Sequence, residues 1–210
     1  MAPDLGQRGL AKPAHPCGKP ARRGAITWER DLDYALRRAK AGGRPVLLYF
    51  RDEASVACRA MDEETFADEF VAEAMAVQVI PALLPHDHIP FAAEYGVTWT
   101  PSLLALDPEG RAHRRDVGFL PPEEFTPFLL LGCAGVYFDG DKFEHAAPLL
   151  DTLLAHHAQS AYAPEARFLL GMTAFKASGD ESHLRLAFED LSRHWPHSLW
   201  TKKARPYADF

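Results

Sequence analysis

The sequence predicts an α/β domain followed by a smaller all-α domain. Residues 26–131 alternate short apolar runs, typical of strands, with segments whose apolar residues recur at helical spacing, which implies one sheet covered by helices on both faces. From about Gly132 to residue 210 the strand patterns disappear and only helical patterns remain. Residues 1–25 are rich in proline and glycine and contain few large apolar side chains, so we expect a disordered tail there.

The α/β region is predicted to open with a helix that ends at Gly42 and Gly43, because glycine commonly terminates helices. A buried strand follows over 46–50, and Ser55, a favoured N-cap residue, starts a second helical segment. The apolar residues that define the first helix are Trp28, Leu32, Ala35, Leu36 and Ala39. The apolar stripe of the second segment continues through Phe66, Phe70, Val71 and Met75.

Three more patterns predict the rest of the sheet. Strands are expected over 77–84 and 99–106, separated by a short helix over 89–95. A turn at Asp107–Gly110 has the residues that tight turns need, and it joins the second of these strands to a hairpin partner over 111–118.

The junction between the strand over 46–50 and the helix after it resembles that of thioredoxins and their relatives. Members of that family have a Cys-x-x-Cys motif whose first cysteine lies five residues after the terminal phenylalanine of the strand. Counting from Phe50 places Ser55 and Cys58 at the two cysteine positions, followed by the basic residue, Arg59, that family members usually have.

Two further segments support the resemblance. Thr100 and Pro101 stand where the family has its cis-proline, and the segment 93–97, Ala-Glu-Tyr-Gly-Val, is similar to the family segment just before it. The resemblance covers roughly residues 26–131 and implies a thioredoxin-like fold. It also implies an exposed backbone at Thr100 that can pair with an extended peptide, in the manner of strand addition.

The motif departs from the family at its reactive position. In the family the first cysteine is the nucleophile, because the helix N-terminus lowers its pKa and a thiolate is present near neutral pH. Ser55 keeps the helix cap but cannot exchange with disulfides. Cys58 would then be a resolving cysteine without an attacking partner. A second departure agrees, since Tyr49 stands where many thioredoxins have a buried acid.

Two functions of different classes are consistent with this motif. The first is a non-enzymatic adaptor or chaperone-like module that binds a protein or peptide client. The second is a monothiol oxidoreductase in which Cys58 is catalytic and works with an external thiol such as glutathione. We expect neither dithiol activity nor a cofactor. The resemblance places the binding groove at Ser55, Val56, Ala57, Thr100 and Pro101.

Ser55 and the three cysteines each have an alternative interpretation. Ser55 either lines the groove or only caps its helix. Cys58 is either a redox-active thiol or a buried, inert one. Cys17, in the tail, could reach Cys58, although nothing in the sequence favours this pairing. Cys133 lies among leucines and is predicted to belong to the core.

Residues 132–210 contain an internal repeat. A Gly-Asp pair at 140–141 recurs 39 residues later at 179–180, and a period near forty residues is typical of stacked helix pairs. The first copy has Ala158 where a proline is expected. The residues that resemble tetratricopeptide positions are Gly171, Ala187 and Pro196. We therefore predict a tetratricopeptide-like helical domain over 132–210, of a type that usually binds peptides.

Composition excludes several other classes. A net charge of −6 argues against a nucleic-acid partner, and no run approaches the ~20 apolar residues of a membrane span. The segment His86-Asp87-His88 contains metal-ligand residue types, but alternate residues of a turn seldom converge on one ion, so we expect no metal site. Three widely spaced cysteines and the lack of a signal sequence predict a cytoplasmic protein, or a periplasmic one if the start lies further upstream.

Overall fold

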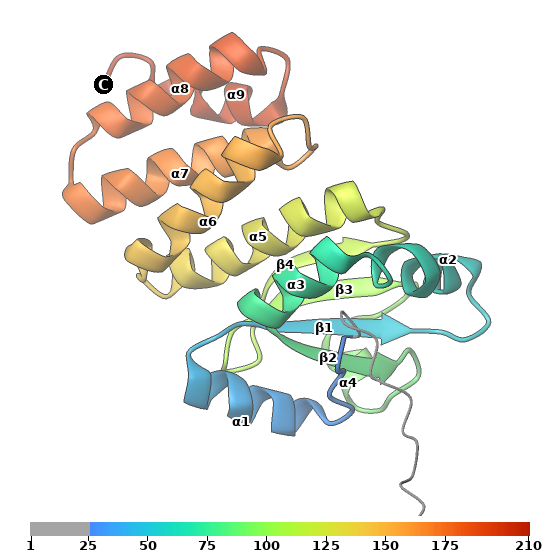
Figure 1. Cartoon of the computed structure of the whole chain (residues 1–210). Coiled ribbons are helices and arrows are strands. Elements are labelled where there is room, and N and C mark those ends of the chain that lie inside the picture. Colours follow the sequence, from blue (N-terminus) through green and yellow to red (C-terminus); the bar gives the residue numbers. More distant parts are fainter. Residues whose placement is uncertain (1–25) are drawn as a thin grey trace, which may run out of the picture.

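A computed structural model describes residues 26–210, so the tail expected over residues 1–25, with Cys17, lies outside the described residues. The chain forms a four-stranded mixed sheet with helices on both faces and continues into a stack of helices (Figure 1). The strand order is β2-β1-β3-β4, with β1 parallel to β2 and the other two neighbouring pairs antiparallel. The strands are β1 Val46–Arg51, β2 Ile80–Pro85, β3 Ser102–Leu106 and β4 Ala112–Val117.

The alternation of side chains along β1 divides the core into two layers. Val46, Leu48 and Phe50 face the layer formed with α1 Leu32–Gly42 and α4 Phe91–Glu94. Leu47 and Tyr49 face the opposite layer. That layer is formed with α2 Val56–Ala60, the short π-helix η1 Met61–Thr65, α3 Glu69–Gln78 and α5 Pro122–Asp139. All five side chains from Val46 to Phe50 are fully buried, as expected of a central strand.

Side-chain caps fix where several helices begin. Asp31 accepts a hydrogen bond from the backbone N–H of Tyr34 and starts α1, and Asp68 caps α3 in the same way. Gly43, at a φ of 64°, ends α1 in the left-handed conformation that glycine adopts without strain. The cap at Asp31 also corrects the sequence prediction, because Trp28 precedes α1 and packs against Tyr49 and Phe66 instead.

The start of one strand and the burial of one side chain also differ from the prediction. The strand expected from residue 77 begins at Ile80, because Val77 still belongs to α3 and is 61% exposed. Phe70, predicted to lie on the apolar stripe of α3, is 78% exposed on its outer surface. The apolar pattern correctly predicted that α3 has a buried face, but Phe70 and Val77 do not lie on that face.

Both edges of the sheet are poorly suited to pair with another strand. On β2, Pro81 and Pro85 provide no N–H, and residue Glu29 already pairs with Pro81 and Leu83 through two backbone hydrogen bonds of 2.9 Å. On β4, the residues His-Arg-Arg-Asp over 113–116 are charged or ionisable, and an irregularity interrupts its register with β3.

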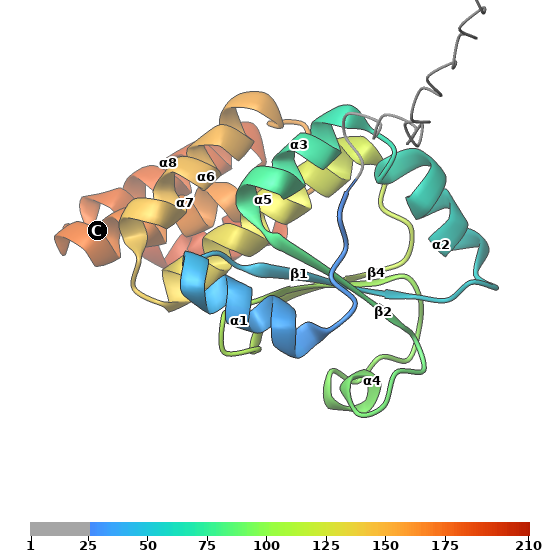
Figure 2. The same cartoon turned by 60° about the horizontal axis from the view of Figure 1, so that its bottom comes forward.

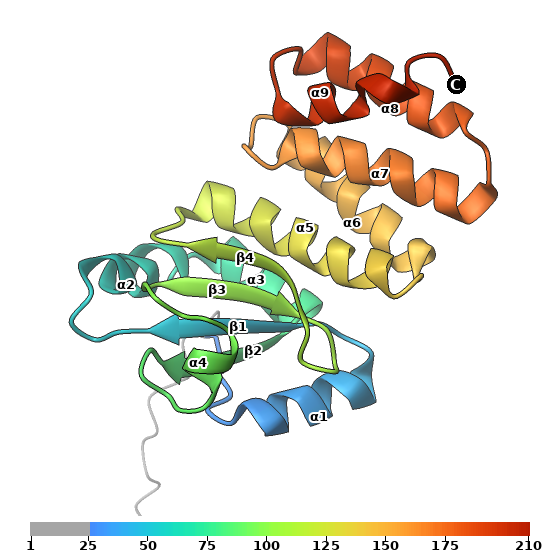
Figure 3. The ribbon, with the colours of Figure 1, turned by 180° about the vertical axis from the view of Figure 1, so that it is seen from behind.

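The helical region stacks on α5. It contains α6 Phe143–His156, α7 Ala163–Ser178, α8 Ser182–His194, α9 Leu199–Ala204 and the short 3-10 helix η2 Arg205–Tyr207. Successive helices pack on one another, and α5 lies between the sheet and the other helices (Figure 3). One face of α5, including Phe125 and Leu129, packs on the sheet layer. Another face, including Leu130 and Ala134, packs with α6 and α7.

The division expected between residues 131 and 132 falls inside this continuous helix. Gly132 lies where α5 approaches the sheet, since a Cβ there would be 2.9 Å from the Cβ of Ala105. Gly171, 39 residues later, lies where α7 approaches α8, and a Cβ there would be 2.4 Å from that of Ala187. The two glycines therefore occupy close helix contacts, one with the sheet and one within the helical stack.

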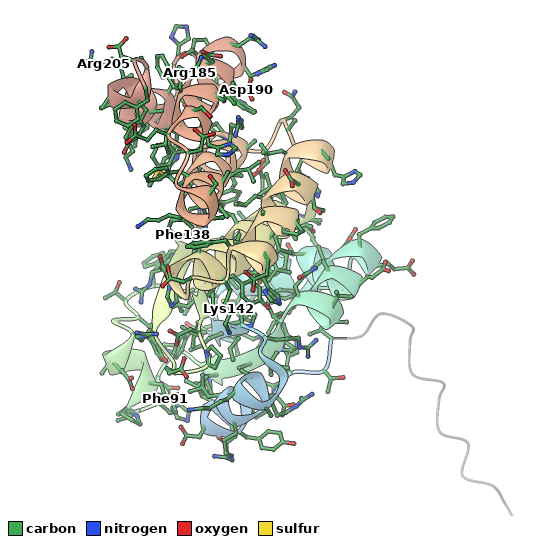
Figure 4. All side chains as sticks on the ribbon, turned by 90° about the vertical axis from the view of Figure 1, so that its left-hand side faces the viewer. Phe91, Phe138, Lys142, Arg185, Asp190 and Arg205 are labelled. Carbon is green, nitrogen blue, oxygen red and sulfur yellow. The ribbon has the colours of Figure 1, made fainter. Side chains whose placement is uncertain are left out.

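Polar contacts add to this junction. Arg114 on β4 forms a two-bonded ion pair with Glu165 on α7, at 2.9 and 3.0 Å, and its guanidinium lies over the ring of Tyr162. Ser160 donates a 2.6 Å hydrogen bond to Glu124 of α5. Figure 4 shows Phe138 and Lys142 at the turn from α5 into α6, above the sheet domain. Polar contacts thus connect the helical region with β4 and with α5.

His113 of β4 forms a second polar connection at the far end of α5. Its two ring nitrogens lie 2.6 Å from an oxygen of Asp139 and 3.0 Å from an oxygen of Asp107. Burial alone would lower the pKa of His113, but the hydrogen bonds to the two carboxylates outweigh it and raise the pKa. A protonated ring can donate to both acids at once, which fixes the β3–β4 turn to α5.

Candidate functional site

The site predicted from the motif lies where β1 ends and α2 begins. Ser55 is the N-cap of α2, and its hydroxyl oxygen accepts a 3.3 Å hydrogen bond from the Cys58 backbone N–H. The same hydroxyl donates to the backbone carbonyl of Thr100, with an O···O distance of 3.4 Å. Ser55 therefore caps the helix and also contacts the segment opposite.

The loop before Ser55 is held by local hydrogen bonds. A carboxylate oxygen of Asp52, Oδ1, accepts from the Ala54 N–H at 2.8 Å, and Arg51 is paired with Asp62 at 2.7 Å. The Asp52 N–H in turn points at the sulfur of Cys58, at 3.4 Å. These contacts tie the loop to the first turn of α2.

Cys58 lies beneath this loop and has no exposed surface. Its backbone carbonyl accepts a hydrogen bond from the Tyr49 hydroxyl at 3.5 Å. Burial raises the pKa of that hydroxyl far above its ordinary value, so Tyr49 stays neutral and cannot take the place of the family's acid as a proton acceptor. Cys58 and Cys133 are both unpaired, buried thiols.

The segment opposite Ser55 runs from Trp99 into β3. The peptide bond between Thr100 and Pro101 is cis, as is that between Ile89 and Pro90. The carbonyl of Pro101 accepts from the Gly118 N–H at 2.8 Å, and the carbonyl of Trp99 accepts from the Ser102 hydroxyl at 2.7 Å. Within this segment Pro101 is buried, whereas Trp99 is 69% exposed.

A groove of about 570 Å³ lies between these two segments. Four of the predicted binding residues, Ser55, Val56, Ala57 and Thr100, line it. Pro101 and Cys58 do not line the groove and lie below its surface. The other lining residues, which the sequence interpretation did not include, are Asp52, Ala54, His86, Val97, Thr98 and Trp99.

The groove is open at one end of the sheet. Figure 2 shows α2 and α4 on opposite sides of the sheet, near the end where β1 stops. The loop from β2 into α4 contributes His86, and the segment after α4 contributes Val97 to Thr100. Position in the sequence could have indicated Trp99, because it adjoins the predicted Thr100, but His86 gave no such signal.

Of the two histidines of the segment 86–88, His86 lines the groove and His88 does not. His88 stacks on Phe91 with ring centroids 5.3 Å apart, and His86 lies 4.0 Å from Asp52. Within residues 26–210, no three or more side chains of His, Cys, Asp or Glu are grouped closely enough to hold a metal ion. Cys133 is fully buried in the sheet layer, as predicted, and burial raises the pKa of its thiol to about 12. Across the same residues, none of the helices has the length and apolar character needed to cross a membrane.

Comparisons with known proteins agree with this fold. Residues 32–131 match a family model described as a thioredoxin-like domain. A thioredoxin from Thermus thermophilus aligns at 27% identity over 55% of this chain and 93% of its own, with a TM-score of 0.50. The oxidised C-terminal domain of DsbD from Neisseria meningitidis aligns at 20% identity over 47% of this chain and 93% of its own, with a TM-score of 0.42.

A further solved structure, described as a DsbH oxidoreductase, has 21% identity over 51% of this chain and 87% of its own, with a TM-score of 0.40. No curated protein matches the chain. The family model and the Thermus structure confirm the fold predicted for the first part of the sequence. Residues 32–131 form a thioredoxin-like domain, and a helical region follows it.

Proposed function

We propose that this protein is a thioredoxin-like adaptor or chaperone-like module that binds extended segments of client proteins and does not exchange disulfides. The observation that supports this most directly is the arrangement at the head of α2. Ser55 caps α2 at the position where the sequence motif places the family's attacking cysteine, and the sulfur-bearing residue after it, Cys58, is completely buried. A serine hydroxyl does not form mixed disulfides, and a covered thiol cannot reach one.

The groove has the properties that a peptide site needs. Thr98, Trp99 and Thr100 line it with irregular backbone, where an extended segment can find hydrogen-bond partners. Val56 and Trp99 are 72% and 69% exposed, so large apolar surfaces stand open to a client. Because both sheet edges are blunted by prolines or charges, the groove is a better place for a peptide than either edge.

The helical region is proposed to be tetratricopeptide-like and to provide a second binding surface. The Gly171 and Ala187 contact between α7 and α8 is a close small-residue packing of the kind that paired helices need. A second groove of about 650 Å³ lies in this region and is lined by apolar residues, by Gln159 and His194, and by the ion pair of Arg167 and Asp190. Its apolar lining residues are Leu154, Ala158, Leu170 and Trp195.

A monothiol oxidoreductase is the second candidate function. One observation favours it: the sulfur of Cys58 accepts a hydrogen bond from Asp52, a residue that lines the groove, so the thiol lies directly behind the groove wall. In that mechanism the Cys58 sulfur would attack a mixed disulfide, release the client thiol, and be regenerated by an external thiol such as glutathione. It requires the loop over 52–54 to open, since the sulfur is covered.

Thiol accessibility and activity distinguish the two functions. For an adaptor, an alkylating reagent should label Cys58 only after unfolding, and the reduction of insulin or of a glutathione mixed disulfide should stay at background. If the folded protein reduces either substrate and Cys58→Ser abolishes this activity, the adaptor proposal is wrong. Cys133→Ser is the matched control, because Cys133 is equally buried but lies in the core away from the groove.

Peptide binding tests the adaptor function directly. Binding of a library of unfolded-protein peptides, followed by fluorescence anisotropy, should weaken in Trp99→Glu and Val56→Glu. Phe70→Glu is the control, because Phe70 is 78% exposed on α3 and does not line the groove. Equal binding by all three variants would place the client site elsewhere.

A further inference from the structure

We infer that the groove selects extended segments in which a lysine or arginine stands beside a bulky apolar residue. This inference rests on the proposed peptide-binding function and adds the chemistry of the client. Of the ten lining residues, Asp52 is the one carboxylate, and none is a lysine or an arginine. A client side chain that enters the groove therefore meets a negative charge with no fixed positive charge beside it in the lining.

The Asp52 side chain is held in place by its own loop but can still accept further hydrogen bonds. Its Oδ1 accepts from the Ala54 N–H, and the side chain remains 30% exposed. Oδ2 has no hydrogen-bond partner among the described residues, and the nearest ring nitrogen, on His86, is 4.0 Å from Oδ1. A carboxylate fixed by its own loop, with one oxygen free, can accept a hydrogen bond from an incoming cation with little loss of side-chain freedom.

Two arginines close to Asp52 in the sequence, Arg51 and Arg59, interact with other groups. Arg51 pairs with Asp62 at 2.7 Å and with Glu53 at 3.4 Å. Arg59 donates to the backbone carbonyls of Glu53 and Ala54, at 3.3 and 3.4 Å. Neither guanidinium contacts the Asp52 carboxylate in the described structure, so neither neutralises it.

The apolar part of the preference comes from the rim. Trp99 presents an indole that is 69% exposed, and Val56 presents an isopropyl group that is 72% exposed. Both line the groove that contains Asp52. An indole face attracts cations as well as apolar groups, so Trp99 and Asp52 favour the same kind of client side chain. An acidic residue at this place in a client would meet repulsion and gain nothing from the indole.

The test uses hexapeptides of sequence Ala-Ser-Leu-X-Ser-Ala, labelled with fluorescein, in which X is lysine, arginine, serine or glutamate. Fluorescence anisotropy at low salt should give affinities for the lysine and arginine peptides about five- to tenfold above that of the glutamate peptide, with serine between them. The preference should shrink at high salt, because partly exposed charges are screened.

Variants assign the preference to Asp52. Asp52→Asn should remove the difference in affinity between the lysine and glutamate peptides, and Asp52→Lys should reverse it. Glu63→Gln is the matched control, since it removes one negative charge from an exposed residue outside the groove. Thermal unfolding of each variant checks that it is folded. Asp52→Lys provides an independent test, because loss of folding cannot reverse a preference.

The outcomes separate this inference from the function on which it rests. Equal affinities for all four peptides, with binding still lost in Trp99→Glu, would overturn the inference and leave the peptide-binding function standing. A lysine preference that persists in Asp52→Asn or Asp52→Lys would also overturn it. If none of the peptides binds and the larger library does not bind either, both the inference and the proposed function are wrong.

Discussion

Replacing Gly171 by alanine should destabilise the helical region, although alanine favours helices. A Cβ at this position would lie 2.4 Å from the Cβ of Ala187 and 3.2 Å from the carbonyl oxygen of His183. Neither neighbour is the flexible end of a side chain, so α7 and α8 would have to move apart. Overpacking of this kind costs about 1–3 kcal/mol, which exceeds the roughly 0.5–1 kcal/mol that alanine gains over glycine in a helix.

The control is Gly135 in α5, where an added Cβ would meet nothing within 4 Å. Gly135→Ala should therefore stabilise the protein by about 0.5–1 kcal/mol, so the same substitution should have opposite signs at the two sites. Urea unfolding followed by far-ultraviolet circular dichroism gives both free energies. A further change of Ala187→Gly in the Gly171→Ala variant removes the colliding methyl and should restore part of the loss.

The reasoning would be refuted if Gly171→Ala were as stable as Gly135→Ala, or if the added Ala187→Gly change had no effect beyond its own cost. Either result would mean that α7 and α8 do not meet at this contact. The proposed tetratricopeptide-like packing would then lose its main support, because that packing depends on a small residue at each side of the contact.

Three other predictions concern the junction and the motif. Arg114→Ala should lower the free energy of unfolding by about 2–3 kcal/mol, because it leaves the partly buried Glu165 without its partner. The exposed pair of Arg185 and Glu189 should contribute less than about 1 kcal/mol. Similar urea midpoints for Arg114→Ala and Arg185→Ala would contradict this. Figure 4 shows Arg185 on α8, away from the sheet. Because the pKa of His113 is raised in the folded state, its contribution to stability should be fully present below about pH 6.5 and be lost as the pH rises through the folded-state pKa. The melting temperatures of the wild type and His113→Gln should accordingly converge at high pH, and a constant difference would disprove the coupling. Ser55→Cys should create dithiol exchange in the insulin assay, and its absence would mean that Ser55 does not take the place of the attacking cysteine.

The sequence predicted the sheet and the head of α2 because their signals are local. Five consecutive apolar residues from Val46 to Phe50 require burial on both faces, and Ser55 is a preferred cap for the helix that follows. The start of β2 was less predictable. Val77 is apolar and β-branched, so it extended the apparent strand, yet α3 continues to Gln78 and leaves Val77 mostly exposed.

Only part of the groove could be predicted from the sequence. The motif indicated Ser55 and Thr100, but Asp52, His86 and Trp99 reach the same groove from three different loops. No periodic pattern links residues so far apart, because loop residues converge through the path of the chain and not through a regular spacing. The groove's charge, on which client selection is proposed to depend, became visible only when those loops were placed together.

The shared helix α5 gives the two proposed binding surfaces a fixed relation. Leu129 belongs to the core under the sheet and Leu130 to the core under α6 and α7, so neither unit can lose α5 without exposing apolar surface. The sequence could not show this, because a run of leucines is equally consistent with one core or two. Two surfaces joined by a flexible linker can engage many client geometries, whereas two surfaces on one helix bind simultaneously only to a client whose segments match their separation. If both grooves bind peptides, the shared helix should therefore restrict the range of clients more than it raises their affinity.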